Sequence, residues 1–386
     1  MIDRRRNTAT VPIVAAEVFE VEAALVVPYK LSEGTLTNTG AVILKLTDAD
    51  GVEGWGEANP SSTFDGDTIG DVAKVLETTF LPAVLAAANP EPGSIDALLD
   101  SMVPKQLCAK GAVSMALLDI LGKRLNVPAA TLLGGAIRES LPVLWPLSNG
   151  TAEEDIRVIE GRLEQGFTSF MLKMGTSPIA DEIRRVFALE ARYGNRIKLI
   201  PDANQGWTRE QAREFLAGIA KSNVMFLEQP LAKDDIAGMA MLAGETTLAL
   251  SADESVIGLA EAGRLASLSA ARVFSIKSSK NGGPLRAQRI AAVAEAFGIN
   301  CYMNSQIEFG ISQAASLQHA VTVVNLVDMG HAFMSTLRLA EDPTNFSSFV
   351  RDGVVHFPSD PGLGIQVEET HVRRLSTASF HIGERR

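Results

Sequence analysis

A strand followed by a helix recurs from about residue 141 to about residue 328, and this repeat constrains the fold more than any other feature of the chain. Short apolar runs indicate buried strands, and they alternate with amphipathic stretches, the first of which opens on a capping box formed by Thr151 and Glu154. Eight such units in about 190 residues favour a parallel (β/α) barrel over an open sheet. The predicted strands are 141–147, 169–173, 197–202, 224–228, 248–253, 273–277, 300–304 and 325–328.

The first third of the chain has a different pattern. Residues 13–21, 39–47 and 52–56 alternate as strands do, with a turn at 48–51, and this pattern indicates an antiparallel meander. From residue 68 to about 125 the apolar period becomes helical. An α+β unit therefore precedes the barrel, and 386 residues are enough for two domains.

Ionisable residues stand at the ends of five successive predicted strands. They are 29, 26, 25 and 24 residues apart, which is one strand–helix unit each time. In a barrel the carboxyl ends of the strands form one ring, and active sites lie on that face. We therefore expect the five side chains to converge on one cavity: Lys173, Asp202, Glu228, Asp253 and Lys277.

Three adjacent carboxylates repel one another near a packed barrel unless a cation neutralises them. The oxygen-only set of Asp202, Glu228 and Asp253 suits Mg²⁺, with Mn²⁺ as an alternative, and no Cys or His stands on these strands to favour zinc. The competing interpretation is that each acid caps the helix that follows it.

Lys173 and Lys277 flank the acids around the ring. A carboxylate substrate held between the two amines could lose the proton of its α-carbon to one and regain a proton from the other. A metal on that carboxylate would stabilise the enediolate. The alternative for each lysine is a structural salt bridge to the acids.

Charge and composition exclude other classes of function. The net charge is −11, with no basic tract beyond residues 4–6, which disfavours nucleic acid as a partner. No apolar stretch is long enough to span a bilayer, and no apolar segment of an export signal follows the basic N-terminus. The two cysteines, Cys108 and Cys301, cannot build a disulfide framework, which is typical of a protein in the reducing cytoplasm. With nucleic acid and membrane disfavoured, we expect the partner to be a small molecule.

Several sequence runs resemble the enolase superfamily, specifically its muconate-lactonizing subgroup, which includes dipeptide epimerases, N-acylamino acid racemases and o-succinylbenzoate synthases. The similarity extends through most of the chain. Residues 119–123 and 132–135 resemble the end of the family's capping domain, and 361–364 its C-terminal return. The barrel runs are 170–175, 202–207, 227–230, 252–255 and 276–283.

The resemblance implies an enolase-type barrel at 138–345, an α+β capping domain at 1–137, and a C-terminal segment at 346–386 that returns to the cap. It also implies a homo-oligomer, Mg²⁺ on the three acids, and Lys173 and Lys277 as the acid/base pair. Cap loops 27–36, with Tyr29, and 59–67 would close over the substrate. Lys30 is expected to be solvated, with binding of a second substrate carboxylate as the alternative. Further residues placed near the substrate or the lysines are Asn204 near the substrate carboxylate, Glu254 paired with Lys277, Asn304, Glu308 and Asp328.

Two positions depart from the family pattern. Met171 stands where the family usually has the first lysine of a Lys-x-Lys pair, so one positive charge near Lys173 is lost. Asp328-Met329-Gly330 stands where dipeptide epimerases carry Asp-x-Asp, which leaves half of an ammonium site. Mandelate racemase-type chemistry uses a histidine at the end of strand seven, but all five histidines here come after Asn304.

The leading prediction is therefore an epimerase or racemase of an amino-acid derivative. A muconate-type cycloisomerase, which needs only one of the lysines, is the alternative. An o-succinylbenzoate synthase-like dehydratase and a barrel that binds a metabolite without turnover come after it.

Overall fold

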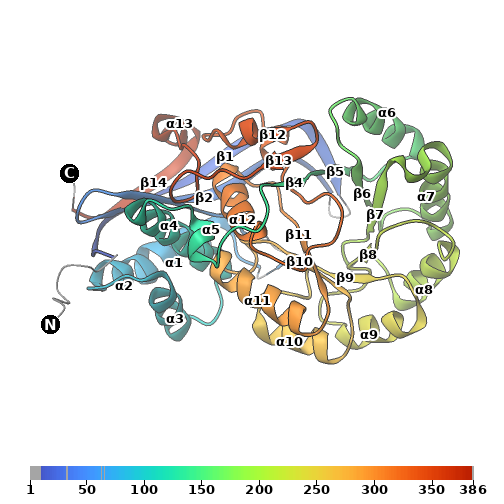
Figure 1. Ribbon diagram of the computed structural model, residues 1–386, viewed down its shortest axis with the longest axis horizontal. Coiled ribbons are helices and arrows are strands. Elements are labelled where there is room, and N and C mark those ends of the chain that lie inside the picture. Colours follow the sequence, from blue (N-terminus) through green and yellow to red (C-terminus); the bar gives the residue numbers. More distant parts are fainter. Residues whose placement is uncertain (1–9, 32–33, 62, 65, 385–386) are drawn as a thin grey trace.

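The computed structural model describes residues 10–31, 34–61, 63–64 and 66–384. An antiparallel sheet with its own helices lies against one side of a curved parallel sheet surrounded by helices (Figure 1). The two parts meet at the carboxyl ends of the parallel strands, where β3 Glu57 accepts hydrogen bonds from the Phe309 and Ser312 amides at 2.8 Å each. A buried carboxylate from the N-terminal part thus caps a barrel helix.

The antiparallel sheet has the order β14-β1-β2-β3. Its hairpin is much longer than predicted, because β1 and β2 continue to pair past a register shift, with Tyr29 opposite Leu36 and Lys30 opposite Thr35. The expected loop at 27–36 is thus largely hairpin strand, and residues 32, 33, 62 and 65 of the two expected cap loops lie outside the described residues. The strands are β1 (Ile13–Leu31), β2 (Gly34–Asp48), β3 (Glu53–Ala58) and β14 (Ser376–Gly383).

Helices cover one face of this sheet, as the helical period from residue 68 predicts. The long helix α4 lies directly on β3, because a Cβ on Gly56 would stand 1.9 Å from the Ala112 carbonyl oxygen. Only glycine allows this approach of helix to strand. The helical elements are α1 (Ile69–Val75), η1 (Leu76–Phe80), α2 (Leu81–Ala86), α3 (Pro92–Met102), α4 (Leu107–Leu125) and α5 (Ala129–Leu132).

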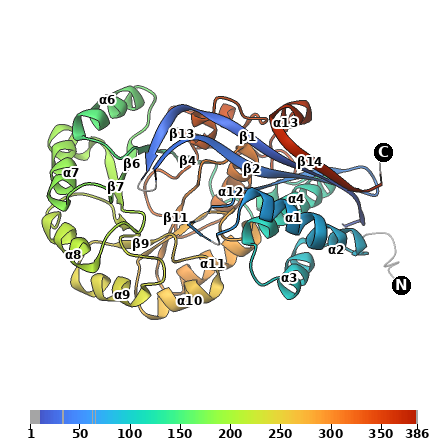
Figure 2. The ribbon, with the colours of Figure 1, turned by 180° about the vertical axis from the view of Figure 1, so that it is seen from behind.

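Seven parallel strands in the order β11-β10-β9-β8-β7-β6-β5 form the curved sheet, and helices follow its outer face in both views (Figures 1 and 2). This arrangement confirms the predicted enolase-type barrel class. The predicted capping box of Thr151 and Glu154 does open α6. The strands are β5 (Leu144–Leu147), β6 (Ser169–Lys173), β7 (Lys198–Asp202), β8 (Leu227–Glu228), β9 (Leu250–Ala252), β10 (Val273–Ile276) and β11 (Asn300–Met303).

The remaining elements surround this sheet or extend from it. The barrel helices are α6 (Ala152–Leu163), α7 (Ile179–Tyr193), η2 (Gly194–Arg196), α8 (Arg209–Gly218), α9 (Ile236–Glu245), α10 (Leu259–Ser267), α11 (Pro284–Ala296) and α12 (Gly310–Ala320). A three-stranded sheet of order β12-β13-β4 lies beside them. The last elements are β4 (Ser140–Pro142), η3 (Ser335–Arg338), η4 (Phe346–Phe349), β12 (Val350–Arg351), β13 (Val354–His356) and α13 (Glu369–Leu375).

The first and last predicted barrel strands need correction. The run 141–147 is split, because β4 pairs antiparallel with β13 and only β5 joins the barrel. Residues 325–328 form a single bridge, Leu326 with Cys301, in place of a strand. The chain then closes the ring through His331, whose amide donates to the Pro142 carbonyl at 2.8 Å and whose carbonyl accepts from Leu144 at 2.9 Å.

Gly330 makes this closure possible. A Cβ there would lie 2.7 Å from the Leu144 nitrogen and 2.8 Å from the Ser169 Cβ, so the closing segment would have to move off the first strand. We expect Gly330→Ala to destabilise the protein by about 2–4 kcal/mol in urea unfolding. The matched control is Gly263→Ala in α10, where a new Cβ meets nothing within 4 Å. That change should stabilise the helix by about 0.5–1 kcal/mol, and equal effects of the two substitutions would contradict the packing argument.

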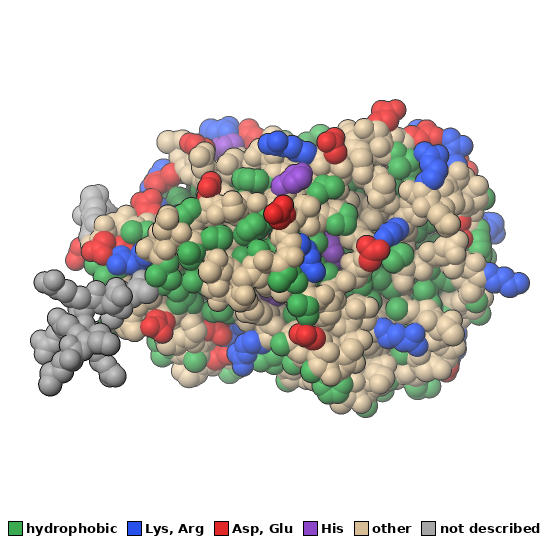
Figure 3. Space-filling model, in the orientation of Figure 1, with side chains coloured by type: hydrophobic (Ala, Val, Ile, Leu, Met, Phe, Trp, Pro, Cys, Tyr) green, Lys and Arg blue, Asp and Glu red, His purple; other side chains and the backbone are tan. Residues whose placement is uncertain are grey.

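The C-terminal segment lies against the N-terminal part. β14 pairs with β1, and the Leu363 amide donates to Asp119 Oδ1 at 2.9 Å, which joins the two runs that resemble the end of the cap and its return. The division at residues 137/138 and 345/346 stays a prediction. In the described part of the chain no helix is both long and apolar enough to cross a membrane. On the face seen in Figure 3 acidic and basic side chains are interspersed.

Candidate active site

The five ionisable residues predicted at strand ends lie on one face of the barrel. β6 ends on Lys173, β7 on Asp202 and β8 on Glu228, and these residues are neighbours in the strand register. Asp253 and Lys277 each follow the last residue of their strands, β9 and β10. The cause is topological, since parallel strands in one barrel bring their carboxyl ends to one edge.

Each of the two lysines forms an ion pair with one of the acids. Lys173 Nζ contacts Asp202 Oδ2, and Lys277 Nζ lies 2.6 Å from Asp253 Oδ2. Burial acts to lower the pKa of each lysine, but the neighbouring carboxylates outweigh it and raise both. The acids therefore favour the ammonium form of both lysines.

Among the five strand-end residues, Glu228 has a buried carboxylate oxygen without a hydrogen-bond partner. Its side chain is fully buried, and burial, followed by repulsion from Asp202 and Asp253, raises its pKa well above the ordinary value. Oε1 accepts hydrogen bonds from Asn304 Nδ2 at 2.7 Å and Ser275 Oγ at 3.2 Å, while Oε2 is buried without a hydrogen-bond partner. A cation would satisfy this oxygen.

The residues fit a divalent metal, which Asp202, Glu228 and Asp253 would hold. The unsatisfied Glu228 oxygen, the oxygen-only donor set and the mutual repulsion of the acids all favour a hard cation such as Mg²⁺. Among the described residues no group of three or more acidic, His or Cys side chains is arranged to hold a metal ion as it stands, and Lys173 and Lys277 each hold one of the acids in an ion pair.

A third lysine was not singled out from the sequence. Lys280 is fully buried, and its Nζ donates to Asp253 Oδ1 at 2.8 Å, to the Asp253 carbonyl at 2.6 Å and to the Ser275 carbonyl at 2.9 Å. Four residues past the end of its strand, it lies outside the strand-end pattern. These three hydrogen bonds hold the Asp253 carboxylate in place and join the ends of β9 and β10.

Three residues expected near the substrate line the same cavity as the lysines: Asn204, Glu254 and Asn304. Asn204 Nδ2 donates to Glu254 Oε1 at 3.3 Å. Glu254 therefore bonds Asn204, while Lys277 forms its ion pair with Asp253 and not with Glu254 as expected. Burial, with Asp253 and Asp202 nearby, raises the pKa of Glu254 to about 7.

Two expected substrate residues lie elsewhere. Glu308 is buried beneath the cavity, where it accepts from Ser279 Oγ at 2.7 Å and Gln313 Nε2 at 3.0 Å. Asp328 is fully exposed, 3.3 Å from Lys198 Nζ at the opposite, amino end of β7. Asp328 lies at the amino end because of how its segment pairs with β11. The Val327 amide donates to the Cys301 carbonyl early in β11, and the chain reaches the carboxyl end of β11 only at Ala332, whose amide donates to Met303.

The residues of the eighth segment that do reach the cavity are therefore Ala332 and Met334. Both side chains are apolar, so the proposed half of an ammonium site at Asp328 is wrong. Met171 also lines the cavity and is buried, on the strand that ends in Lys173. This side of the cavity thus has no charge suited to a free ammonium group.

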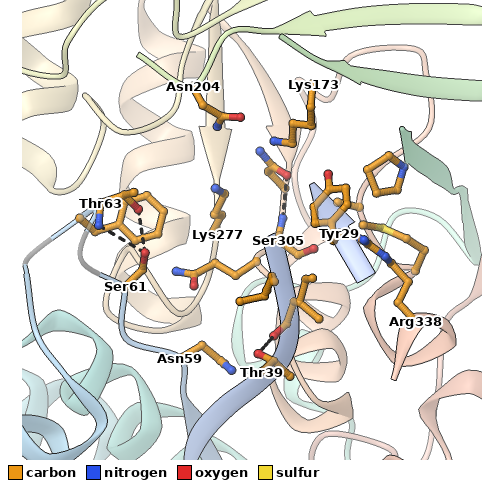
Figure 4. A pocket seen from close by; sticks show the side chains of 18 of the residues that line it. Tyr29, Thr39, Asn59, Ser61, Thr63, Lys173, Asn204, Lys277, Ser305 and Arg338 are labelled. Atoms are coloured by element: carbon orange, nitrogen blue, oxygen red, sulfur yellow. Dashed lines mark hydrogen bonds between the residues drawn. The ribbon is translucent and has the colours of Figure 1, made fainter. Parts of the chain in front are cut away.

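The cavity measures about 450 Å³ and lies between the barrel and the cap (Figure 4). Tyr29 from the hairpin and Phe64 from the loop 59–67 both line it, as the prediction of two cap loops over the substrate implies. Lys277 Nζ lies 4.9 Å from the centre of the Phe64 ring, so the cap covers the amine of this lysine.

Lys233, on the loop after β8, anchors the cap loop to the barrel. Its Nζ donates to the Thr63 carbonyl at 3.0 Å and to the Phe64 carbonyl. We expect Lys233→Met to raise KM about 10-fold with a smaller change in kcat, because the loss of two charge-assisted hydrogen bonds loosens the loop without touching the lysine pair. The exposed Lys221→Met is the control. A fall in kcat with KM unchanged would contradict this role.

The chain matches two protein families. Residues 13–134 match the mandelate racemase / muconate lactonizing enzyme N-terminal domain, and residues 154–371 match the enolase C-terminal domain-like family. The chain is 31% identical to muconate cycloisomerase 1 of Pseudomonas putida, with 90% of this chain and 94% of that one covered. It is 30% identical to the L-Ala-D/L-Glu epimerase of Bacillus subtilis, with 92% and 96% covered. The crystal structure of the N-succinyl Arg/Lys racemase from Bacillus cereus superposes with a TM-score of 0.91 at 27% identity, over 96% of this chain and 100% of that one.

Proposed function

Because this chain belongs to the mandelate racemase / muconate lactonizing enzyme family and is an isomerase of the enolase superfamily, we propose that it racemises or epimerises an amino-acid derivative. The substrate would be a small carboxylate, and the cofactor Mg²⁺, with Mn²⁺ as an alternative. A cytoplasmic location and a homo-oligomeric state stay predictions.

One observation carries this proposal: Lys173 and Lys277 both line one covered cavity, with side chains only 13% and 7% exposed. Inversion at a carbon needs a base on one face and an acid on the other. In the proposed reaction one lysine, as the free amine, takes the α-proton, and the other, as ammonium, donates a proton to the opposite face. Lys277 lies beneath Phe64, which keeps water from this amine.

Asp202, Glu228 and Asp253 would hold the metal, which when bound stabilises the negative charge that the substrate carboxylate gains as the proton leaves. Asn304 orients Glu228 through its 2.7 Å hydrogen bond. Asn204 and Glu254 line the same cavity, where the Asn204 amide would donate a hydrogen bond to the substrate carboxylate.

Cycloisomerisation of a muconate-like diacid is the second candidate. It is favoured by the relatives named muconate cycloisomerase, which match about as well as the epimerase. That reaction needs one lysine to protonate the enolate that ring closure leaves. The apolar Ala332 and Met334 favour neither candidate over the other, but they argue against substrates with a free amino terminus.

Proton NMR in D₂O with Mg²⁺ tests the proposal, with pooled dipeptides, N-acylamino acids, proline betaines and muconates as substrates. Loss of an α-proton signal together with inversion of configuration is the expected result. Loss of muconate vinyl signals would establish cycloisomerisation instead. Aromatic product would indicate a dehydratase, and silence across the pools with metal bound would indicate a barrel that binds without turnover.

A further inference from the structure

Arg338 lines the cavity that Lys173 and Lys277 also line. It ends η3, and the two residues after it are tied to β1 by the bridge of Leu339 with Leu25 and by the 2.8 Å hydrogen bond from Ala340 to the Ala24 carbonyl. Its guanidinium stacks on the Tyr29 ring, 3.8 Å from the ring centre, and the two side chains lie together in Figure 4. The hairpin and the barrel thus hold this cation in place from both sides.

The Arg338 guanidinium has no acidic partner among the described residues. No carboxylate there lies within 4.0 Å of it, whereas Arg185 and Arg286 each pair with one. Burial lowers the pKa of Arg338, with Tyr29 acting in the opposite direction. A guanidinium remains charged throughout the usual pH range, so this one is a partly desolvated cation without a counter-ion.

Arg338 also lies where two cavities meet. A second cavity of about 360 Å³ shares Tyr29, Pro146 and Arg338 with the cavity that holds the lysines. Its wall carries further cations, among them Arg162, which stacks on Trp145 at 3.4 Å. Its two acids already have partners: Asp155 accepts from Arg185 at 2.6 and 2.9 Å, and Glu154 accepts from the Thr151 amide at 2.9 Å. The junction is therefore electropositive.

A ligand that satisfies this cation must bring a negative group of its own. An arginine fork binds a carboxylate through two parallel hydrogen bonds, and such bonds are strongest where water is excluded. The reacting carboxylate would lie at the metal on Asp202, Glu228 and Asp253. Arg338 also lines the second cavity, whose lining includes none of these acids and neither Lys173 nor Lys277. A ligand that reaches both places thus needs two anionic groups.

We propose that Arg338 binds a second carboxylate of the substrate, distal to the carbon that loses its proton. This inference rests on the proposed function and narrows its substrate class to a dianion, such as an amino acid whose nitrogen carries an acyl chain that ends in a carboxylate. The acyl chain would run past Met334 and Tyr29 towards the junction of the two cavities.

Binding of two matched glycine derivatives tests the assignment. N-succinylglycine carries the second carboxylate, and N-succinamoylglycine replaces it with a neutral amide of the same shape. Glycine has no stereocentre, so calorimetric titration in Mg²⁺ measures affinity without inversion. We expect the wild-type protein to bind the dianion about 10- to 100-fold more tightly than the amide. A ratio near one, or no binding of either compound, would overturn the proposal.

Arg338→Met should reduce that ratio to about one, because it keeps an apolar stem against Tyr29 and removes only the charge. Arg338→Lys should keep part of the preference, since an ammonium lacks the fork. The surface substitution Arg213→Met, which removes an exposed ion pair with Glu245, should leave the ratio unchanged. Arg338→Met should not lower the unfolding temperature, because no described carboxylate loses its partner. An unchanged ratio in Arg338→Met would show that the second carboxylate binds elsewhere.

The outcome is separable from that of the proposed function. If the wild-type protein prefers the dianion and loses that preference in Arg338→Met, but exchanges no α-proton of any N-succinylamino acid in D₂O, the site assignment stands and the racemase proposal fails. If α-proton exchange is rapid but N-succinyl and N-succinamoyl substrates react equally well, the racemase proposal stands and the role of Arg338 fails.

Discussion

Lys173→Ala and Lys277→Ala should each lower the rate of inversion by about 10³- to 10⁴-fold, the upper range for loss of a general acid or base. Among the described residues no other lysine replaces the lost group, since the third lysine, Lys280, is held by three hydrogen bonds to the Asp253 and Ser275 oxygens. The measurement is the rate of inversion by polarimetry, with Lys221→Ala on the surface as the control.

Isotope exchange makes this prediction sharper. If the lysines face opposite sides of the substrate, each single variant keeps one base, so it should still exchange the α-proton of one enantiomer with D₂O but not that of the other. The two variants should show opposite preferences. Exchange of the same enantiomer by both variants would mean that one lysine does all the proton transfer, and full activity in both would refute the mechanism.

The strand-end residues were predictable because their position follows from topology. Once alternating strands and helices indicate a parallel barrel, Lys173, Asp202 and Glu228 must share a face, whatever the surrounding side chains are. The end of the eighth segment was not predictable in this way. It carries no apolar strand pattern, and its register depends on the close contact of Gly330 with Leu144, which no local pattern encodes.

Residues that make contacts between the two parts of the molecule could not be predicted from the sequence either. Arg338 follows no strand and matches no motif; its position depends on η3 meeting the hairpin at Tyr29. Phe64 and Lys233 are 169 residues apart, and only the folded chain shows that the barrel lysine holds the cap loop. Long-range contacts of this kind depend on packing between elements, and the periodicity of either segment does not encode that packing.

Removal of divalent metal should abolish proton exchange, and Mg²⁺ should restore it. A stability measurement tests the site without any substrate. A ligand that binds only the folded state stabilises it by RT ln(1 + [L]/Kd), so Mg²⁺ at 100 times its Kd should add about 2.7 kcal/mol to the free energy of unfolding. The unfolding temperature should rise accordingly, and no rise in Mg²⁺ or Mn²⁺ would contradict the metal site.

Glu228→Gln distinguishes a metal site from a purely structural cluster of charges. In the metal-free protein this carboxylate is buried, faces Asp202 and Asp253, and leaves Oε2 without a partner, so its replacement by a neutral amide should not destabilise the fold. The same change should weaken Mg²⁺ binding by about 100-fold or more, since even residues that only orient a metal ligand contribute 10- to 100-fold. The variant should thus be as stable as the wild-type protein without metal but gain little when Mg²⁺ is added. The matched control is Glu245→Gln at an exposed ion pair, which should respond to Mg²⁺ as the wild-type protein does.

A different result would contradict the metal site. If Glu228→Gln unfolds more easily without metal and keeps its full response to Mg²⁺, then Glu228 belongs to the charge network of the barrel and the ion binds elsewhere.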